Sequence, residues 1–413
     1  MLQKLGIGPA AMGSVWAEPA RLALGITLLL GCARPTSAPP APASKELELG
    51  RRFVAELPFR RAALEKSLAV TENGEARSRL AHYAQAGEWE ALPILNAELA
   101  PVTMGSALGW ARLWTGQVSW DEPALLALGQ RAFEEWPAQR APQLTPLLAA
   151  SPTPATRRRL DSVGAWVDAR GRVGGFVWAR YPDGTTEPAL SCASCHARPD
   201  SAGHLQHGPA SDFDLGALVG EDWGPGRVDV TADARDNPVA IADLRATRHQ
   251  QRLHHTGNLY AGLGALAVRT ETLLITARDA LVRPPREIAF ALAYYVWWLG
   301  ERSPGPEPAP SALFHENCGR CHSGATGAGS IVSAAELGID AAAANSPLRG
   351  TGGYRAPSLY RVSQRRRLTH LGWELTLEQF LSPERLTTHP GHPFGLDLDA
   401  ERRQALVREL AHW

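Results

Sequence analysis

Apolar side chains recur every three or four positions along much of the chain, and this spacing predicts amphipathic helices. The stretches with this pattern are 47–58, 75–99, 110–131, 287–299 and 401–413. The stretch 287–299 is apolar on nearly every face, which predicts a helix buried against a large, flat partner. It is too short to span a membrane. Residues 164–168 and 175–179 flank a turn that contains Gly171, and this pattern predicts a β-hairpin.

Two pairs of segments resemble each other without gaps. The segment 47–58 recurs as 126–137, and the segment 244–257 recurs as 359–372. For the first pair, a true duplication and a chance match of two amphipathic helices both stay open. The second pair carries several identical residues in the same order, which indicates two units built in the same way.

The composition is that of a globular protein. The chain has 413 residues, of which 44% are hydrophobic and 20% are charged, and this length allows two or three domains. Its 42 basic and 42 acidic side chains balance. This balance gives no basic surface for nucleic acid, so we expect no nucleic-acid partner.

Four of the five cysteines form two copies of a CxxCH motif. Two thiols three positions apart reach the two vinyl groups of one porphyrin, and the next residue places an imidazole on the iron. The sequence therefore predicts two covalently bound haem c groups. Thioether bonds are expected at Cys192, Cys195, Cys318 and Cys321, and proximal iron ligation at His196 and His322.

Paired cysteines also occur in zinc sites and in redox-active dithiols. A zinc ribbon spaces its CxxC pairs roughly 15–20 residues apart, whereas these two pairs lie far apart in the sequence and each is followed by histidine. A thioredoxin-like dithiol would need a βαβ setting, which neither motif shows. The pattern favours haem over both alternatives.

The fifth cysteine, Cys32, ends an apolar segment that follows Arg21. The segment is too short to span a bilayer and predicts the core of a signal peptide. Leu29 to Cys32 resembles the bacterial lipobox, in which the cysteine becomes the acylated first residue. An ordinary signal peptide and a buried helix remain alternatives. Haem attachment of this kind requires export in bacteria, so both signals predict a lipid-anchored protein of the cell envelope, facing the periplasm or the exterior.

The predicted fold class is mainly α, with two cytochrome c-like haem domains preceded by an N-terminal helical region. Short helices that wrap a porphyrin gain apolar contacts which so little chain could not otherwise bury. The predicted segments are a lipoprotein signal peptide (1–31), a tether (32–44), the N-terminal helical region (45–154), haem domain 1 (155–302), a Pro-rich linker (303–310) and haem domain 2 (311–413).

The ligand opposite each proximal histidine decides the function. A second strong ligand makes an electron carrier, whereas an open position can bind peroxide. Methionine is nearly excluded, because the mature chain contains only Met104, upstream of both motifs. His255 and His370 occupy equivalent positions of the second repeat and are candidate distal ligands or pocket contacts. The competing histidines are His204, His207, His249 and His254 for the first iron, and His315, His389 and His392 for the second.

Two arginines are candidates for contacts with the haem propionates. Arg227 follows a Gly-Pro-Gly turn, and Arg355 precedes Ala-Pro-Ser-Leu. A guanidinium group can hold a carboxylate through two parallel hydrogen bonds. A solvent-facing position is the alternative for each.

Several segments resemble the bacterial di-haem cytochrome c peroxidase superfamily. Tyr354 to Leu359, Leu368 to Gly372 and Leu375 to Glu378 are similar to its segment "P-S-L-R … H-D-G … T-L-E-E". Ser191 to His196 is similar to its first haem segment. The resemblance spans 185–413 and implies two haems in two domains.

The chain departs from that superfamily at positions that concern its activity. There, a methionine follows the H-D-G motif and ligates the electron-transfer haem, but no methionine follows Met104 here. Leu371 and Thr256 stand where the motif has aspartate. We therefore expect electron transfer between redox partner proteins at a membrane surface. The alternatives are a di-haem peroxidase that reduces hydrogen peroxide, and a haem-based sensor or a subunit of a larger redox complex.

Overall fold

The described part of the chain begins just before the first helix. The computed structural model describes residues 44–84, 98–101, 118–148, 153–167, 172–181, 185–200, 203–229, 236–276, 284–300, 309–324 and 326–413. The predicted signal peptide, Cys32, nearly all of the tether, Met104 and most of the Pro-rich linker lie outside these residues. By its contacts, the stretch Ala43–Trp413 is one unit.

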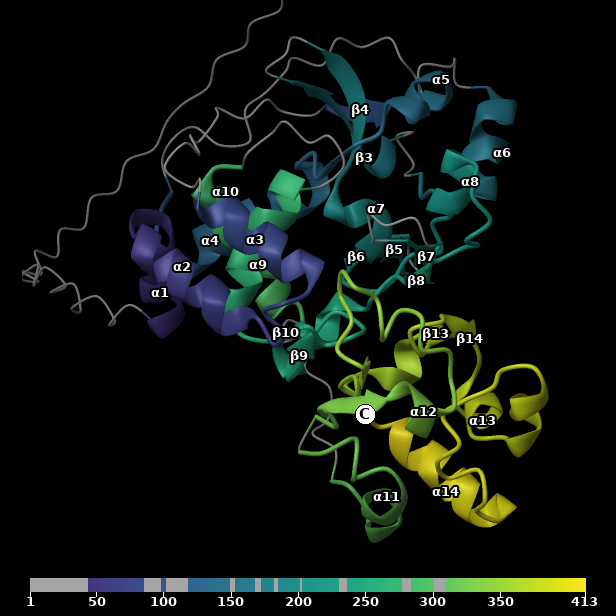
Figure 1. Ribbon diagram of the computed structural model, residues 1–413. Coiled ribbons are helices and arrows are strands. Elements are labelled where there is room, and N and C mark those ends of the chain that lie inside the picture. The colour runs from purple at the N-terminus through teal and green to yellow at the C-terminus, as the bar shows by residue number, and fades with distance from the viewer. Residues whose placement is uncertain are drawn as a thin grey trace, which may run out of the picture. The chain divides into compact units, whose positions relative to one another are not determined.

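Helix α10 (Arg286–Trp298) lies at the centre of an apolar core. Its sequence is apolar on almost every face, and the run from Ile288 to Tyr295 is buried throughout. Helices α4 (Glu122–Glu135), α9 (Leu263–Thr276) and α1 (Lys45–Ala55) pack against it, and Figure 1 shows α4, α9 and α10 together. Helices shorter than about 15 residues are marginal alone, so these depend on mutual packing.

The two helices of the first internal repeat approach α10 through equivalent glycines. A Cβ on Gly50 of α1 would lie 2.4 Å from the Phe290 ring, and one on Gly129 of α4 would lie 2.2 Å from the Ala291 carbonyl oxygen. The repeated glycine therefore allows close helix packing in both copies. The copies also share an ion pair across one helical turn, Arg52–Glu56 at 3.2 Å and Arg131–Glu135 at 3.4 Å.

The apolar core around α10 crosses the domain boundary predicted at 154/155. Phe53, Leu64 and Tyr83 from the N-terminal helices share it with Leu259 and Phe290. Helix α2 (Leu57–Ser67) contacts α9 directly. The predicted N-terminal helical region therefore packs into the same core as helices of the predicted first haem domain.

The remaining described helices contain 4 to 11 residues each. They are α3 (Gly74–Ala84), α5 (Thr145–Leu148), α6 (Pro154–Ser162), α7 (Cys192–His196), α8 (Leu215–Val219), α11 (Ala312–Asn317), α12 (Ala334–Leu337), α13 (Leu377–Phe380) and α14 (Ala400–Leu410). Four 3₁₀ helices are described, η2 (Pro142–Leu144), η3 (Leu244–His249), η4 (Val362–Gln364) and η5 (Pro383–Thr387).

One four-stranded antiparallel sheet precedes the first CxxCH motif. Its order is β1 (Glu98–Pro101), β3 (Arg172–Arg180), β4 (Thr186–Leu190) and β2 (Gln139–Arg140). The hairpin predicted from 164–168 and 175–179 is only partly observed. The second segment lies in β3 but pairs with β4, and the first contributes the single bridge Val167–Val173.

Five described two-stranded sheets lie along the rest of the chain. They are β5 (Ala197–Pro199) with β6 (Leu205–His207), β7 (Arg227–Val228) with β8 (Val239–Ala240), β9 (Arg252–Leu253) with β10 (Leu259–Tyr260), β11 (Ile331–Ser333) with β12 (Gly353–Arg355), and β13 (Arg367–Leu368) with β14 (Trp373–Glu374). Helix is the main element, as expected, at 46%, but these small antiparallel sheets make the fold mixed.

The second internal repeat has the same backbone conformation in both copies. Strands β9 and β13 occupy equivalent positions, and each is followed by a non-glycine residue with positive φ, His254 at 64° and Thr369 at 62°. Three positions further on, Gly257 has a φ of 64° and Gly372 a φ of 73°. The left-handed conformation is costly for residues other than glycine. Because both copies adopt it at the same two positions, they share one specific turn.

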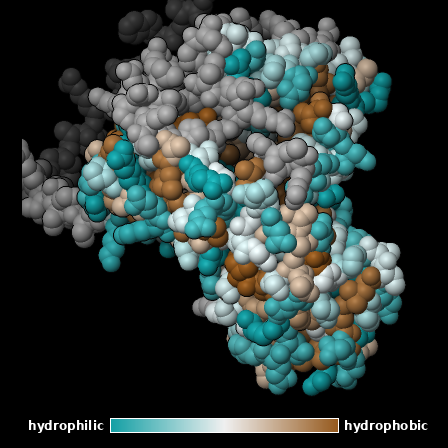
Figure 2. All heavy atoms as spheres, viewed as in Figure 1, coloured by the Kyte–Doolittle hydropathy of each residue, from teal (hydrophilic) through white to brown (hydrophobic). Residues whose placement is uncertain are grey.

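The surface is mainly hydrophilic on the face shown in Figure 2, with hydrophobic residues in scattered groups. Tyr260, Leu273 and Leu386 are the large hydrophobic side chains exposed among the described residues. Scattered apolar side chains of this kind are usual on protein surfaces. Of the helices in the described ranges, none combines the length and the hydrophobicity needed to cross a membrane.

Candidate functional site

The first CxxCH motif forms the short helix α7. The Ser191 hydroxyl caps the helix by accepting a hydrogen bond from the Ala193 amide at 3.3 Å. Strand β3 lies close against α7 at Gly175, whose carbonyl accepts from the Ser191 amide at 2.8 Å. A Cβ on Gly175 would lie 2.0 Å from the Ser194 nitrogen. Cys192 and Cys195 are thereby held on one helical turn.

The histidine of this motif has a fixed orientation. Nδ1 of His196 lies 2.9 Å from the Ala242 carbonyl oxygen. A carbonyl oxygen only accepts, so Nδ1 carries the hydrogen and Nε2 keeps the lone pair that a metal needs. Burial lowers the pKa of His196 to about 4, so the ring is neutral at physiological pH.

The second CxxCH motif follows α11 and also forms one helical turn. The Cys318 carbonyl accepts from the amides of Cys321 at 3.1 Å and His322 at 2.8 Å. Nδ1 of His322 lies 2.8 Å from the Gly327 carbonyl oxygen, which assigns the hydrogen to Nδ1 as in the first motif. Burial lowers the pKa of His322, although contacts of the ring with the backbone of Gly327 and Pro357 act in the opposite direction. In both motifs, therefore, the histidine that follows the two cysteines contacts a backbone carbonyl through Nδ1.

The four thiols are not poised for redox exchange. All four are free. Burial raises the pKa of Cys192 to about 12 and that of Cys318 to about 11, and it also raises the pKa values of Cys195 and Cys321. Reactive dithiols instead have lowered pKa values. In the described ranges no three His, Cys, Asp or Glu side chains are grouped so as to hold a metal ion.

A cavity of about 230 Å³ lies against the second motif, and Cys318, Cys321 and His322 are among the residues that line it. The apolar residues of the lining include Phe314, Leu337, Leu359, Trp373, Phe380, Leu381, Phe394 and Leu410. The apolar part of the lining therefore favours an apolar occupant.

The cavity lining carries an excess of positive charge. Its arginines are Arg198, Arg320, Arg355, Arg365, Arg366 and Arg367, and its carboxylates are Asp212 and Asp243. Asp212 pairs with Arg366 and Arg367, and Asp243 pairs with Arg245. Arg355 and Arg365 each retain a buried nitrogen without a hydrogen-bond partner. Such cations favour an occupant that brings carboxylates.

The two predicted propionate contacts lie in different places. Arg355 lines the cavity, where its Nε donates to the His254 carbonyl at 2.6 Å. Burial and the neighbouring Arg365 lower the pKa of Arg355 to about 10. Arg227 lies near His370, and its Nη2 donates to the Pro238 carbonyl at 3.0 Å. Arg355 is therefore the better placed of the two for an anion in this cavity.

The two repeat histidines, His255 and His370, are brought together at the cavity wall. Their ring centroids lie 6.4 Å apart. Nε2 of His255 donates to the Ala240 carbonyl at 2.9 Å, so this nitrogen is occupied. The His370 ring stacks on Tyr354 with centroids 4.0 Å apart. Burial lowers the pKa of His255 to about 4 and that of His370 to about 3. Both rings are placed as neutral groups of the pocket.

Of the competing histidines, His392 is the one that faces a CxxCH histidine. Its ring centroid lies 6.5 Å from that of His322, with an angle of 49° between the rings, and both rings line the cavity. Burial lowers the pKa of His392 to about 3. No sequence pattern favours His392 over the other histidines, because it belongs to neither repeat and its loop has no periodic pattern.

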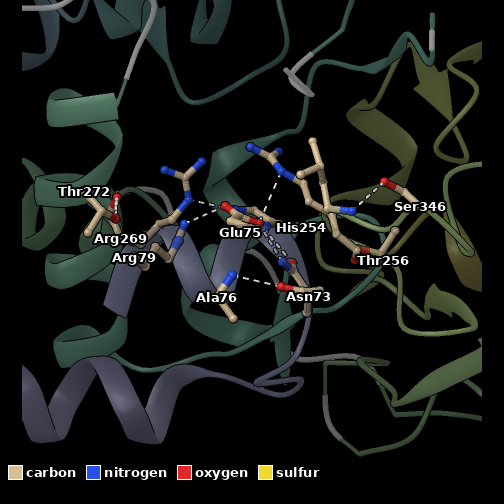
Figure 3. Close-up of polar contacts among 12 residues, drawn as sticks. Asn73, Glu75, Ala76, Arg79, His254, Thr256, Arg269, Thr272 and Ser346 are labelled. Carbon is tan, nitrogen blue, oxygen red and sulfur yellow. Dashed lines mark hydrogen bonds and ion pairs between the residues drawn. The ribbon is translucent and has the colours of Figure 1, made fainter. Parts of the chain in front are cut away.

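The other competing histidines have partners elsewhere. His207 contacts the Tyr295 hydroxyl through Nδ1 at 2.6 Å. His249 packs on the Tyr360 ring. His254 takes part in a buried charged cluster, where Nδ1 donates to Asn258 at 2.7 Å and Nε2 accepts from Arg269 at 2.7 Å. Figure 3 shows this cluster around Glu75. His204 and His315 do not line the cavity, and His389 lies against Trp373.

Similarity to known proteins does not identify the function of this site. Comparisons with protein families, with known proteins and with solved structures find no match to this chain. The resemblance to the di-haem peroxidase superfamily therefore stays a prediction. What the site does has to be inferred from the two cysteine turns, the cavity and its charges.

Proposed function

We propose that this protein is an exported, lipid-anchored di-haem c-type cytochrome that transfers electrons between redox partner proteins at a membrane surface. The observation that carries the proposal is the arrangement shared by the two CxxCH turns. In each, the histidine that follows the thiols donates through Nδ1 to a backbone carbonyl, His196 to Ala242 and His322 to Gly327. This hydrogen bond leaves Nε2 for iron, as in other metal-binding histidines.

The residues at the second motif fit a haem. The walls of the cavity are rich in apolar rings, and its arginines exceed its carboxylates. A porphyrin with two propionates would fill the apolar space and neutralise part of the positive charge. Cys318 and Cys321 would bind it covalently, His322 would ligate the iron, and Arg355 and Arg365 would hold carboxylates. When bound, such a group supplies one-electron transfer.

The two turns define the proposed domain plan. Residues 155–302 and 311–413 would each form a cytochrome c-like haem unit, and 45–154 would pack as the N-terminal helical region. The first unit would bind its haem through Cys192, Cys195 and His196. The proposed anchor is a lipid on Cys32, which would place both haems near the membrane surface, where redox partners can dock.

The proposal is tested by counting covalent haem. The full chain, produced in a bacterium that attaches haem c to exported proteins, should have a denatured mass that includes two haems. The double variant Cys192→Ala, Cys195→Ala should retain one, and so should Cys318→Ala, Cys321→Ala. A wild-type protein that releases all its haem on denaturation would overturn the proposal.

The same preparation separates electron transfer from peroxide reduction. The holoprotein should be reduced and reoxidised reversibly by small redox mediators and should consume hydrogen peroxide no faster than a matched mono-haem cytochrome. Rapid consumption of peroxide after partial reduction would replace the electron carrier with a di-haem peroxidase.

A further inference from the structure

We infer that His392, together with His322, would ligate the iron of a haem bound at the second CxxCH motif. The inference rests on the proposed function and assigns a coordination site to a residue outside both repeats. It makes this centre a six-coordinate, bis-imidazole site. Such a site is used for electron transfer and leaves no position for peroxide.

The separation of the two rings fits one metal ion between them. A metal-to-imidazole nitrogen bond measures about 2.0–2.1 Å for zinc, and bonds to iron are of similar length. Two imidazoles on opposite sides of one ion therefore have ring centroids about 6 Å apart. The rings of His322 and His392 lie 6.5 Å apart. At this separation the two rings do not touch each other, and the space between them would hold one metal ion but no further molecule.

The two rings also face the same space as the two thiols. Cys318, Cys321, His322 and His392 all line one cavity. His255 and His370 have a similar spacing, 6.4 Å, but neither follows a pair of cysteines. Distance alone would not distinguish the two pairs, whereas the thiols beside His322 do.

The His392 ring is free to accept a metal. Its Nδ1 is buried and has no hydrogen-bond partner, although buried polar atoms are paired in the great majority of cases. No hydrogen bond joins the ring to another described residue. By contrast, Nε2 of His255 is bonded to Ala240. Leaving a buried nitrogen unpaired costs free energy, and a bound metal ion would remove that cost by accepting its lone pair.

The loop that carries His392 is held in place by Arg385. The Arg385 guanidinium donates to the carbonyls of His389 at 2.8 Å, Gly391 at 2.7 Å and His392 at 2.8 Å. The His392 amide donates to the Leu337 carbonyl at 2.6 Å. His392 has a φ of 50°, a strained conformation for a residue other than glycine that persists where the surroundings fix it.

The ring itself is oriented by two aromatic side chains. Phe380 lies 4.9 Å away and Phe394 lies 5.4 Å away, centroid to centroid. His389 stands three residues earlier on the same loop, but its Nδ1 contacts the Thr388 hydroxyl at 2.9 Å. His389 therefore offers a matched control, a nearby histidine of the same loop that does not face His322.

The test uses His392→Ala, His392→Met and His389→Ala in the full-length holoprotein. Haem is counted by mass, and spin state by electron paramagnetic resonance of the oxidised form. Wild type and His389→Ala should each contain two haems, the second of them low-spin. His392→Ala should also contain two haems but gain one equivalent of high-spin signal, and its reduced form should bind one equivalent of carbon monoxide more than wild type.

If the alanine variant does not fold, the methionine variant still tests the assignment. His392→Met keeps the side-chain volume, and it should remain low-spin while gaining the weak long-wavelength band of methionine bound to ferric haem. Two haems with an unchanged spin state in His392→Ala, or with no such band in His392→Met, would overturn the assignment of His392. A wild type without covalent haem would instead overturn the proposed function.

Discussion

The imidazole rings of His255 and His370, which occupy the same position in the two copies of the second repeat, lie with their centroids 6.4 Å apart. Both are tied to the backbone of Ala240. The Ala240 carbonyl accepts from the His255 ring at 2.9 Å, and the Ala240 amide donates to the His370 carbonyl at 2.8 Å. The His255 carbonyl in turn accepts from the Arg355 amide at 2.9 Å. The pair therefore joins the two repeat copies through strand β8.

Replacing His255 should affect stability and leave the haems unchanged. In His255→Ala the buried Ala240 carbonyl loses its donor, which should lower the free energy of unfolding by about 1–3 kcal/mol. Because its Nε2 is already bonded, no iron should lose a ligand. Denaturant unfolding and electron paramagnetic resonance measure the two effects, with the exposed His204→Ala as control. A new high-spin signal in His255→Ala would show that His255 is an axial ligand.

Replacing Arg365 should lower the reduction potential of the haem proposed at the second motif. Arg365 lines the cavity and retains a buried nitrogen without a partner. A nearby positive charge stabilises the reduced haem, which carries one positive charge fewer than the oxidised form. Arg365→Gln should shift the potential by tens of millivolts, where about 59 mV corresponds to a tenfold change for one electron. Redox titration measures the shift, and the exposed Arg402→Gln should show none. Equal potentials in the two variants would contradict a role for Arg365.

The buried carboxylate of Glu75 should make stability depend on pH. Burial alone would raise the pKa of this carboxyl. The basic side chains around it lower the pKa by more than burial raises it, so the pKa lies well below its usual range; these side chains are His254, Arg349, Arg79 and Arg269. Its folded pKa is thus below the unfolded value of about 4.3. The stabilisation is complete above that value and is lost as the pH falls through the folded pKa.

Glu75→Gln should therefore destabilise the protein most at neutral pH. Removing one partner of a buried ion pair costs about 3–5 kcal/mol, and here it would leave Arg79 and Arg349 without their carboxylate. The difference from wild type should shrink as the pH falls below about 4. Unfolding curves measured across this range test the prediction, with the exposed Glu72→Gln as control. A difference that does not vary with pH would mean that Glu75 is not ionised in the folded protein.

Two helical glycines should respond oppositely to alanine. A Cβ on Gly129 would lie 2.2 Å from the Ala291 carbonyl oxygen, whereas one on Gly264 of α9 would have no neighbour closer than 3.9 Å. Gly129→Ala should push α4 away from α10 and cost about 1–3 kcal/mol. Gly264→Ala should be neutral or stabilise by up to about 1 kcal/mol. Thermal unfolding distinguishes the two, and an unaffected Gly129→Ala would mean that α4 and α10 can separate without cost.

The proposed lipid anchor on Cys32 can be tested by cell fractionation. Cys32→Ala should move the protein from the membrane to the soluble fraction of the envelope, because the acyl chains could no longer be attached. Its haem content should stay at the wild-type value, since Cys32 lies outside both CxxCH motifs. A variant that fractionates as wild type does would contradict the lipobox prediction.

The elements with strong local signals were predictable from the sequence. The helix expected over 287–299 is confirmed as α10. Helix α14 covers most of the helix expected over 401–413. A helix apolar on every face can only be buried, so pattern alone determines its place. The short strands were not predictable, because two-residue pairs such as β9 with β10 leave no period to detect. The second repeat was visible because its turn requires glycine at Gly257 and Gly372.

The site was predictable only where the chemistry depends on local spacing. Cysteines three positions apart with a following histidine can be recognised in one short segment. The relation of His322 to His392 depends on how a distant loop folds around Arg385, and no local pattern encodes that. The predicted equivalence of His255 and His370 is real in the backbone. This equivalence does not indicate which histidine ring lies opposite the histidine of either CxxCH motif.

The cluster around Glu75 has a consequence for the order in which the chain folds. The Glu75 carboxylate, near the start of helix α3, accepts from Asn258, 183 residues away at 2.6 Å, and pairs with Arg349 at 3.2 Å. The backbone amides of Gly74 and Glu75 donate to the carbonyls of Pro347 and Leu348. Contacts of such long range form slowly. Because residues 347–349 are synthesised long after α3, we expect α3 to reach its final packing only when most of the chain has been made.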